Sequence, residues 1–170
     1  MSEFIYNQHE IPRDKWRYGF RSSAATGCGW IATYNALKLL GCDPDPSELI
    51  RYYSRKMPFY NGLFGTFISN PSGFFRKSGF EVQTCLRRDS FSKTVRESEV
   101  CILYYCWREK WKFGAHYIAL HQKNDTIIAY NVFRNSCGPD VLGSDLPEFM
   151  EKQHYFLPVL FGIKRKCETL

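Results

Sequence analysis

The stretch Thr26–Leu37, "TGCGWIATYNAL", places one cysteine, Cys28, between two glycines at the start of an apolar segment. Apolar residues then recur at helical spacing until Gly41, which predicts a helix that begins at Cys28. Glycines on both sides leave the sulfur poorly covered, an unusual setting for a cysteine that only packs. The stretch therefore predicts a long central helix and a candidate reactive thiol.

The hydrophobic pattern changes between the two halves of the chain. Two further helices are predicted in the first half, one in "DPDPSELIRYY" with Asp45 as N-cap and one in "PSGFFRKSG" that ends at Gly79. The second half contains one late helix, "SDLPEFMEKQ", with Ser144 as its cap. It also contains five segments rich in Val, Ile, Tyr and Phe that read as strands: "FEVQTC", "EVCILYYCW", "AHYIALHQ", "TIIAYNVF" and "FLPVLFGIK".

Helices that precede a mostly antiparallel sheet indicate an α+β fold, with the central helix packed on the sheet. The 170 residues, 44% of them hydrophobic, predict one domain over 1–170. Residues 1–26 lack sustained periodicity, and we interpret them as an irregular N-terminal arm.

Composition limits the compartment and the cofactors. The start "MSEFIYNQHE" has no secretory pattern, and no apolar run has the length of a membrane span, so we expect a cytoplasmic protein with no membrane partner. The seven cysteines are an odd number without a Cys-x-x-Cys pair, and the four histidines do not cluster. These features predict reduced thiols, no metal site and no cofactor.

The formal net charge of +6 does not by itself indicate a nucleic-acid partner. Basic groups lie at Arg87–Arg88, in Trp107–Phe113 and at Lys164–Lys166, and such scattered charges around no recognisable binding module make nucleic acid an unlikely partner. Trp107 and Trp111 could line a substrate cleft, but we interpret them as packing against the sheet. The oligomeric state is not visible in the sequence.

A base for Cys28 must be one of four histidines, and His116 has the best partner. The turn "KND" joins the strand of His116 to a return strand that carries Asn131. With Lys123–Asn124 as the loop His116 pairs directly with Asn131; with Asn124–Asp125 as the loop the two are diagonal. Both registers place the side chains on one face, where an Asn131 amide oxygen could accept from one imidazole nitrogen. A three-residue loop would break this relationship.

The position of Cys28 also predicts its ionisation. Unsatisfied N–H groups and the positive end of the helix dipole favour a thiolate, and a neighbouring imidazolium favours it further. No Asp or Glu lies between Lys15 and Asp43 to oppose the anion. The Cys28 N–H could donate to an oxyanion.

With "GCGWIATYNAL", "GAHYIAL" and "YNVF", the chain resembles the papain-like cysteine peptidases, particularly the bacterial relatives of bacteriocin-leader peptidases. The resemblance implies a papain-like fold over roughly residues 20–165. It also implies Cys28 as nucleophile, His116 as general base and acid, and Asn131 as the residue that orients His116. The implied reaction passes through an acyl-enzyme on a peptide or protein substrate and is completed by water.

The chain departs from that family at the oxyanion donor. The position that usually carries Gln falls among Ser22, Ser23 and Ala24 here, so the nearest upstream candidate is Gln8, which requires the N-terminal arm to fold back over the cleft. Two other functions remain open. One is a deamidase, an acyltransferase or a de-conjugating enzyme at the same site, and the other is a catalytically silent binding module.

Overall fold

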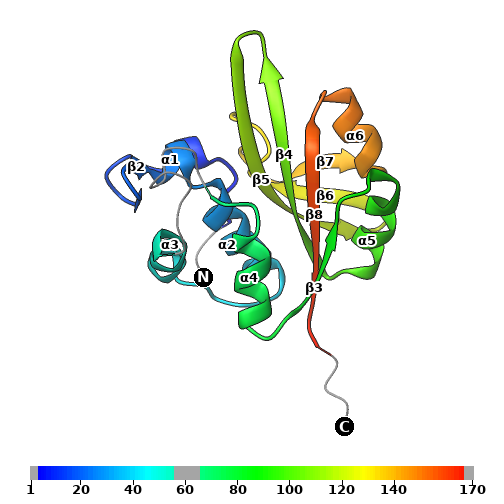
Figure 1. Ribbon diagram of the computed structural model, residues 1–170, viewed down its shortest axis with the longest axis horizontal. Helices are drawn as coiled ribbons and strands as arrows, with labels where there is room; N and C mark the ends of the chain where they lie inside the picture. Colours follow the sequence, from blue (N-terminus) through cyan, green and yellow to red (C-terminus); the bar gives the residue numbers. More distant parts are fainter. Residues whose placement is uncertain (1–3, 56–65, 167–170) are drawn as a thin grey trace.

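Helices lie on both sides of one antiparallel sheet (Figure 1). The structure is a computed structural model, which describes residues 4–55 and 66–166 of the chain. The strand order is β3-β8-β4-β5-β6-β7, and every neighbouring pair is antiparallel. The strands are β3 (Glu81–Cys85), β4 (Val100–Glu109), β5 (Lys112–Lys123), β6 (Thr126–Tyr130), β7 (Asp140–Gly143) and β8 (Phe156–Lys164).

Alternation along β5 divides the core into two clusters. Tyr117 and Ala119 pack with Cys28 and the N-terminal helices, whereas Ile118 and Leu120 pack with the helices on the other side. Successive side chains of a strand point to opposite faces, so one strand can serve both cores. The N-terminal helices are α2 (Cys28–Leu39), α3 (Pro46–Arg55) and α4 (Asn70–Lys77), and those of the other side are α5 (Phe91–Glu97) and α6 (Leu146–Lys152).

The predicted α+β architecture with a central helix on the sheet is confirmed. The helix α2 begins at Cys28, and its residues 28–37 are all buried. Asp45 was predicted to cap α3, and its carboxylate accepts the Ser47 N–H at 2.9 Å at the start of that helix. Gly79, with φ of +89°, follows α4 and allows the chain to turn into β3.

Three local expectations differ from the structure. The cap of α6 is Asp145, whose carboxylate accepts the Glu148 N–H at 3.0 Å, and not Ser144. The elements α5 and β7 were not predicted, because their short sequences carry no clear period. The predicted strand "TIIAYNVF" ends as β6 at Tyr130, since the next residue has a left-handed backbone.

The N-terminal arm contains short ordered elements within its described part. These are η1 (Gln8–Glu10), β1 (Arg17–Tyr18), β2 (Arg21–Ser22) and α1 (Ser23–Thr26). Asn35 of α2 holds the arm through two bonds to Ile5, accepting its N–H at 3.0 Å and donating to its carbonyl at 2.8 Å. Because Asn35 is buried, these bonds fix the path of the arm just before Gln8.

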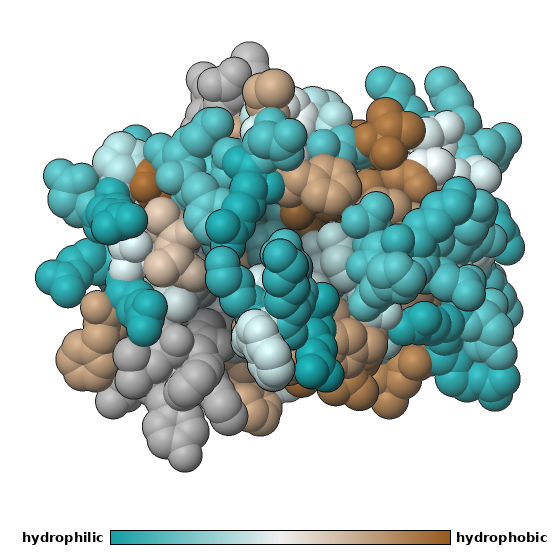
Figure 2. Space-filling model, turned by 90° about the horizontal axis from the view of Figure 1, so that it is seen from above, coloured by the Kyte–Doolittle hydropathy of each residue, from teal (hydrophilic) through white to brown (hydrophobic). Residues whose placement is uncertain are grey.

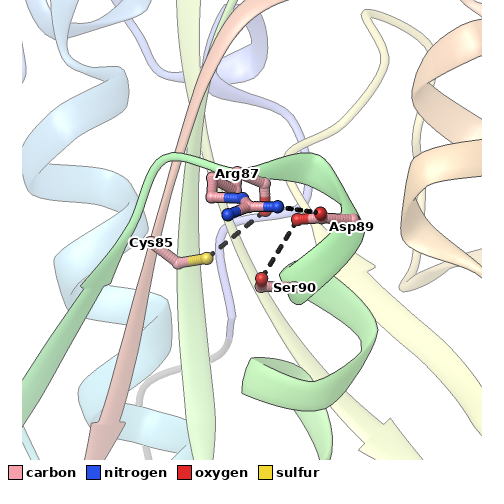
Figure 3. A network of polar contacts seen from close by, with 4 residues as sticks. All are labelled: Cys85, Arg87, Asp89 and Ser90. Atoms are coloured by element: carbon pink, nitrogen blue, oxygen red, sulfur yellow. Dashed lines mark hydrogen bonds and ion pairs between the residues drawn. The ribbon is translucent and has the colours of Figure 1, made fainter.

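The connection from β3 to α5 is held by a local polar network (Figure 3). The guanidinium of Arg87 pairs with Asp89 at 2.6 Å, Ser90 donates to the same carboxylate at 3.1 Å, and the Cys85 thiol donates to the Arg87 carbonyl. This turn includes the 3-10 helix η2 (Arg88–Ser90). Asp89 thus offsets the charge of Arg87, so Arg87 adds little to the net positive charge of the surface.

The strands β4 and β5 continue past the sheet as a two-stranded ribbon (Figure 1). Trp111 lies in the turn that joins these strands and is 98% exposed, so the interpretation that it packs against the sheet is wrong. Within the described ranges, no helix combines the length and the hydropathy that a membrane crossing requires.

Candidate active site

Cys28 is the first residue of α2 and lies against β5. Its side chain is 7% exposed. Backbone amide groups of Tyr117, Gly29 and Cys28 itself surround the sulfur and favour its anion. Since Tyr117 follows His116 directly, the sulfur adjoins the main chain of β5 beside the predicted base. The His116 side chain itself has the opposite strand parity to Tyr117 and packs on Tyr105.

The two glycines beside Cys28 permit close packing, and the expectation of a poorly covered sulfur is wrong. A Cβ on Gly29 would overlap the Thr66 side chain, and a Cβ on Gly27 would overlap the Ser23 carbonyl and the Trp30 indole. Thr66 is itself buried and contacts the hydroxyl of Tyr18 at 3.1 Å. The glycines therefore let neighbouring segments close over the start of α2.

Burial opposes the thiolate that the sequence predicted. Desolvation raises the pKa of Cys28 to about 11, although the N–H groups of Tyr117, Gly29 and Cys28 act in the opposite direction. The helix terminus therefore lowers the cost of the anion without removing it. At neutral pH the resting side chain is a thiol, which corrects the expectation of a preformed ion pair.

The β5–β6 hairpin adopts the second of the two registers left open by the sequence. Lys123 pairs with Thr126, and the loop is Asn124–Asp125, both with positive φ, as in a type I′ turn. Asn131 therefore follows the last β6 residue near Ile118, diagonal to His116. Its own φ of +65° takes it out of the strand, so strand parity no longer decides where its side chain points.

His116 and Asn131 come together, but through a different atom from the one predicted. The Nε2 of His116 lies 2.6 Å from the Asn131 backbone carbonyl. The predicted bond to the side-chain amide oxygen is wrong, because that oxygen accepts the Gln8 N–H at 2.8 Å. A carbonyl oxygen can only accept, so Nε2 carries the proton and Nδ1 keeps a lone pair. Asn131 thus fixes the tautomer of His116 through its main chain.

The imidazole of His116 is half-buried and neutral at rest. Burial lowers the pKa of His116 to about 4, with the Asn131 carbonyl acting in the opposite direction. The ring packs edge-on against Tyr105, with centroids 5.8 Å apart. Within residues 4–55 and 66–166, no hydrogen bond joins the Cys28 sulfur to this ring. The sulfur lies near the Tyr117 amide, next to His116 in the chain, but no proton is shared between Cys28 and His116 at rest.

Gln8 reaches the site because the N-terminal arm folds back, as the oxyanion assignment required. Its Oε1 accepts from Asn131 Nδ2 at 3.2 Å, and its Nε2 donates to the Ala24 carbonyl at 3.3 Å. The hydroxyl of Ser23 accepts the Trp30 indole N–H at 3.1 Å. Gln8 is buried and lines the same cleft as His116.

A cleft of about 540 Å³ opens beside His116. It is bordered by the β4–β5 ribbon, by the segment that follows β6 and by the N-terminal arm. Its lining residues are Gln8, His9, Ala25, Tyr105, Trp107, Arg108, Glu109, Lys112, Ala115, His116, Asn131, Val132, Phe133, Arg134, Gln153 and Tyr155. An extended segment of a few residues fits such a volume.

The other histidines and cysteines do not form a second site. His121 is on β5 with the opposite parity and packs near Tyr130, and His154 follows α6. The described cysteines are all free, and the described residues contain no group of three or more potential metal ligands. Cys167 lies outside the described residues.

Two contributors to the site could not be found from the sequence. The Tyr117 amide acts on the sulfur from a strand far from Cys28 in sequence, and Thr66 covers Gly29 from another remote segment. The left-handed backbone of Asn131 did have a signal, since Asn tolerates positive φ better than most residues.

Comparison with known proteins yields a structural likeness only. No family model matches the chain, and no curated protein matches it in sequence. Among solved structures it is similar to the peptidase domain of Streptococcus ComA, described as a bi-functional ABC transporter involved in a quorum-sensing pathway. The TM-score is 0.55 at 12% identity, and the match covers 84% of this chain and 93% of that chain. This likeness confirms the predicted papain-like fold.

Proposed function

We propose that the protein is a cysteine peptidase in which Cys28 is the nucleophile, His116 the general base and acid, and Asn131 the residue that orients His116. The main support is the bond from His116 Nε2 to the Asn131 carbonyl, because it leaves Nδ1 as the proton acceptor. A sulfur at a helix N-terminus, next to the residue after His116, is the group that this acceptor would serve.

In this account the thiol is activated only when substrate is bound. As Cys28 Sγ forms its bond to the peptide carbonyl carbon, its proton passes to Nδ1 of His116. The imidazolium then gives that proton to the departing amine as the C–N bond breaks, leaving a thioester on Cys28. Water attacks the thioester with His116 again as base, which releases the acid and restores the thiol.

The developing oxyanion has two candidate donors. One is the Cys28 backbone N–H at the start of α2, which has no intrahelical acceptor. The other is Gln8, whose Nε2 carries a second N–H besides the one donated to Ala24. Removing one such donor typically slows turnover about a hundredfold or more, so a Gln8→Ala variant should retain binding and lose most of its rate.

The same groups support an alternative reaction, acyl transfer or deamidation, because the thioester can be released by an amine or formed from a side-chain amide. Product analysis separates these reactions. Hydrolysis gives new carboxylates, transfer to added methylamine gives methylamides, and deamidation leaves the peptide backbone intact. A silent binding module would give none of these products.

The test is cleavage of a tryptic digest of a bacterial proteome, read by mass spectrometry of new termini. We expect wild-type protein to generate new termini, and Cys28→Ala and His116→Ala to generate none above background. Matched controls are Cys137→Ala, an exposed thiol, and His121→Ala, a histidine on the same strand, which should cleave as wild type does. Cleavage that survives Cys28→Ala would overturn the proposal. The cytoplasmic location and the single domain stay predictions of the sequence.

A further inference from the structure

The cleft beside His116 carries an unbalanced charge. Its cations are Arg108 and Lys112 of the β4–β5 ribbon and Arg134 of the segment after β6, and its one carboxylate is Glu109. None of these four side chains forms a salt bridge with another described residue. Three cations therefore line the cleft without forming a salt bridge among the described residues.

Of these cations, Arg134 lies near His9 at the edge of the cleft. Arg134 helps to lower the pKa of His9, second to burial, and His9 in turn acts on the pKa of His116 in the same direction. Seen from the end at which the ribbon projects, hydrophilic side chains cover most of this face, with hydrophobic ones between them (Figure 2). The aromatic residues that line the cleft are Tyr105, Trp107 and Phe133.

The cleft lies on the side of the reaction from which the amine departs. It is lined by His116, which must protonate the leaving nitrogen, and not by Cys28, which holds the acyl group. A group that receives a proton from His116 must lie within hydrogen-bond reach of the ring. The chain that follows the scissile bond would therefore run into this cleft.

We propose that the cleft binds the leaving-group side of the substrate and selects a segment with acidic side chains there. The inference rests on the proposed function for the direction of the chain and on the charges of Arg108, Lys112 and Arg134 for its composition. Aromatic walls accommodate the peptide, and the cations pair with Asp or Glu. The uncompensated Arg and Lys also disfavour a basic segment.

A binding experiment tests the selection without requiring turnover. Three fluorescein-labelled peptides carry Glu, Gln or Lys at the same two positions and are otherwise identical. Each is titrated with the Cys28→Ala protein at 50 mM salt, and binding is followed by fluorescence anisotropy. We expect the Glu peptide to bind about tenfold more tightly than the Lys peptide, with the Gln peptide between them. Raising the salt to 500 mM should shrink this ratio.

Charge reversal assigns the preference to the cleft. Arg108→Glu with Arg134→Glu should invert the Glu-to-Lys ratio, whereas Arg51→Glu with Arg96→Glu, two exposed arginines on α3 and α5, should leave it unchanged. Three results would overturn the inference: equal binding of the three peptides, binding too weak to detect, or a Glu-to-Lys ratio that is unchanged in the cleft variant (Arg108→Glu with Arg134→Glu).

The cleavage products separate this inference from the function on which it rests. In the wild-type digest we expect Asp and Glu to be enriched after the scissile bond, and the cleft variant to lose that enrichment. Cleavage without acidic enrichment would overturn the acidic selection and leave the peptidase standing. Selective binding of the Glu peptide with no cleavage by the wild type would overturn the peptidase and the direction of the chain, and leave an acidic-peptide site.

Discussion

Nε2 of His116 donates to the main-chain carbonyl of Asn131 at 2.6 Å, while the side-chain amide of Asn131 forms two hydrogen bonds with Gln8. The residue thus has two separable duties. Its left-handed backbone aims the carbonyl at the imidazole, and its amide anchors the folded-back N-terminal arm. A substitution can remove one duty and keep the other.

Asn131→Gly and Asn131→Ala should therefore differ. Glycine keeps the positive φ and loses only the bonds to Gln8, so we expect a loss of stability of about 1 kcal/mol and partly retained turnover. Alanine in a left-handed conformation costs a further 1–2 kcal/mol or so, and it tends to move the carbonyl away from His116. Urea unfolding and the cleavage rate of the peptide digest measure both effects. Equal turnover in the two variants would contradict a role for the carbonyl.

The thiol of Cys28 should be slow to alkylate at neutral pH. Burial raises its pKa to about 11 and leaves it 7% exposed, so iodoacetamide meets little thiolate. We expect labelling at Cys28 to lag behind labelling of exposed Cys42 between pH 6 and 8 and to rise toward pH 11, as followed by peptide mapping. A fast plateau that begins near pH 4 would instead reveal a stable thiolate–imidazolium pair.

Acid should destabilise the protein through His116. Its folded pKa is lowered to about 4 from 6.5, so the unfolded chain binds the proton first. Stability is complete above pH 6.5 and is lost as the pH falls toward 4, by about 1–3 kcal/mol for this residue. His116→Gln should flatten that part of the pH dependence of urea unfolding. An unchanged profile in His116→Gln would show that the ring is not held neutral by burial.

Close packing over the start of α2 predicts a sharp effect of one methyl group. Gly29→Ala should push Thr66 away, with a destabilisation of about 1–3 kcal/mol and slower turnover. Gly73→Ala in α4 is the control, because its Cβ would meet open space and should stabilise the helix by up to about 1 kcal/mol. Thr66→Gly should rescue part of the loss. Equal changes in the thermal unfolding midpoint for Gly29→Ala and Gly73→Ala would contradict the packing role of Gly29.

Strong local patterns explain what could be predicted from the sequence. The helix at Cys28 and the cap at Asp45 follow from residue spacing, and β4, β5 and β8 follow from segments rich in Val, Ile, Tyr and Phe. The hairpin loop was narrowed to two registers by the same reasoning, and both placed Asn131 near His116. The order of a helix-start cysteine, a strand histidine and a following asparagine was therefore enough to identify the candidate site residues.

The remaining features depend on tertiary contacts that spacing does not encode. The ionisation of Cys28 was predicted from its helix terminus, a neighbouring imidazolium and the lack of nearby carboxylates in the sequence, yet burial outweighs these effects. The orienting atom of Asn131 was assigned by strand parity, which its φ of +65° breaks one residue after β6. The cover over Gly29 comes from Thr66, a residue no local window around Cys28 contains.

Covalent trapping with a peptidyl chloromethyl ketone tests the central claim most directly. The reagent places a carbonyl where the scissile bond would lie, so Cys28 can attack it with His116 taking the proton. We predict one adduct per chain, mapped to Cys28 by mass spectrometry, and its loss in His116→Ala but not in His121→Ala. An adduct on another cysteine, or labelling of Cys28 at the same rate without His116, would contradict the account.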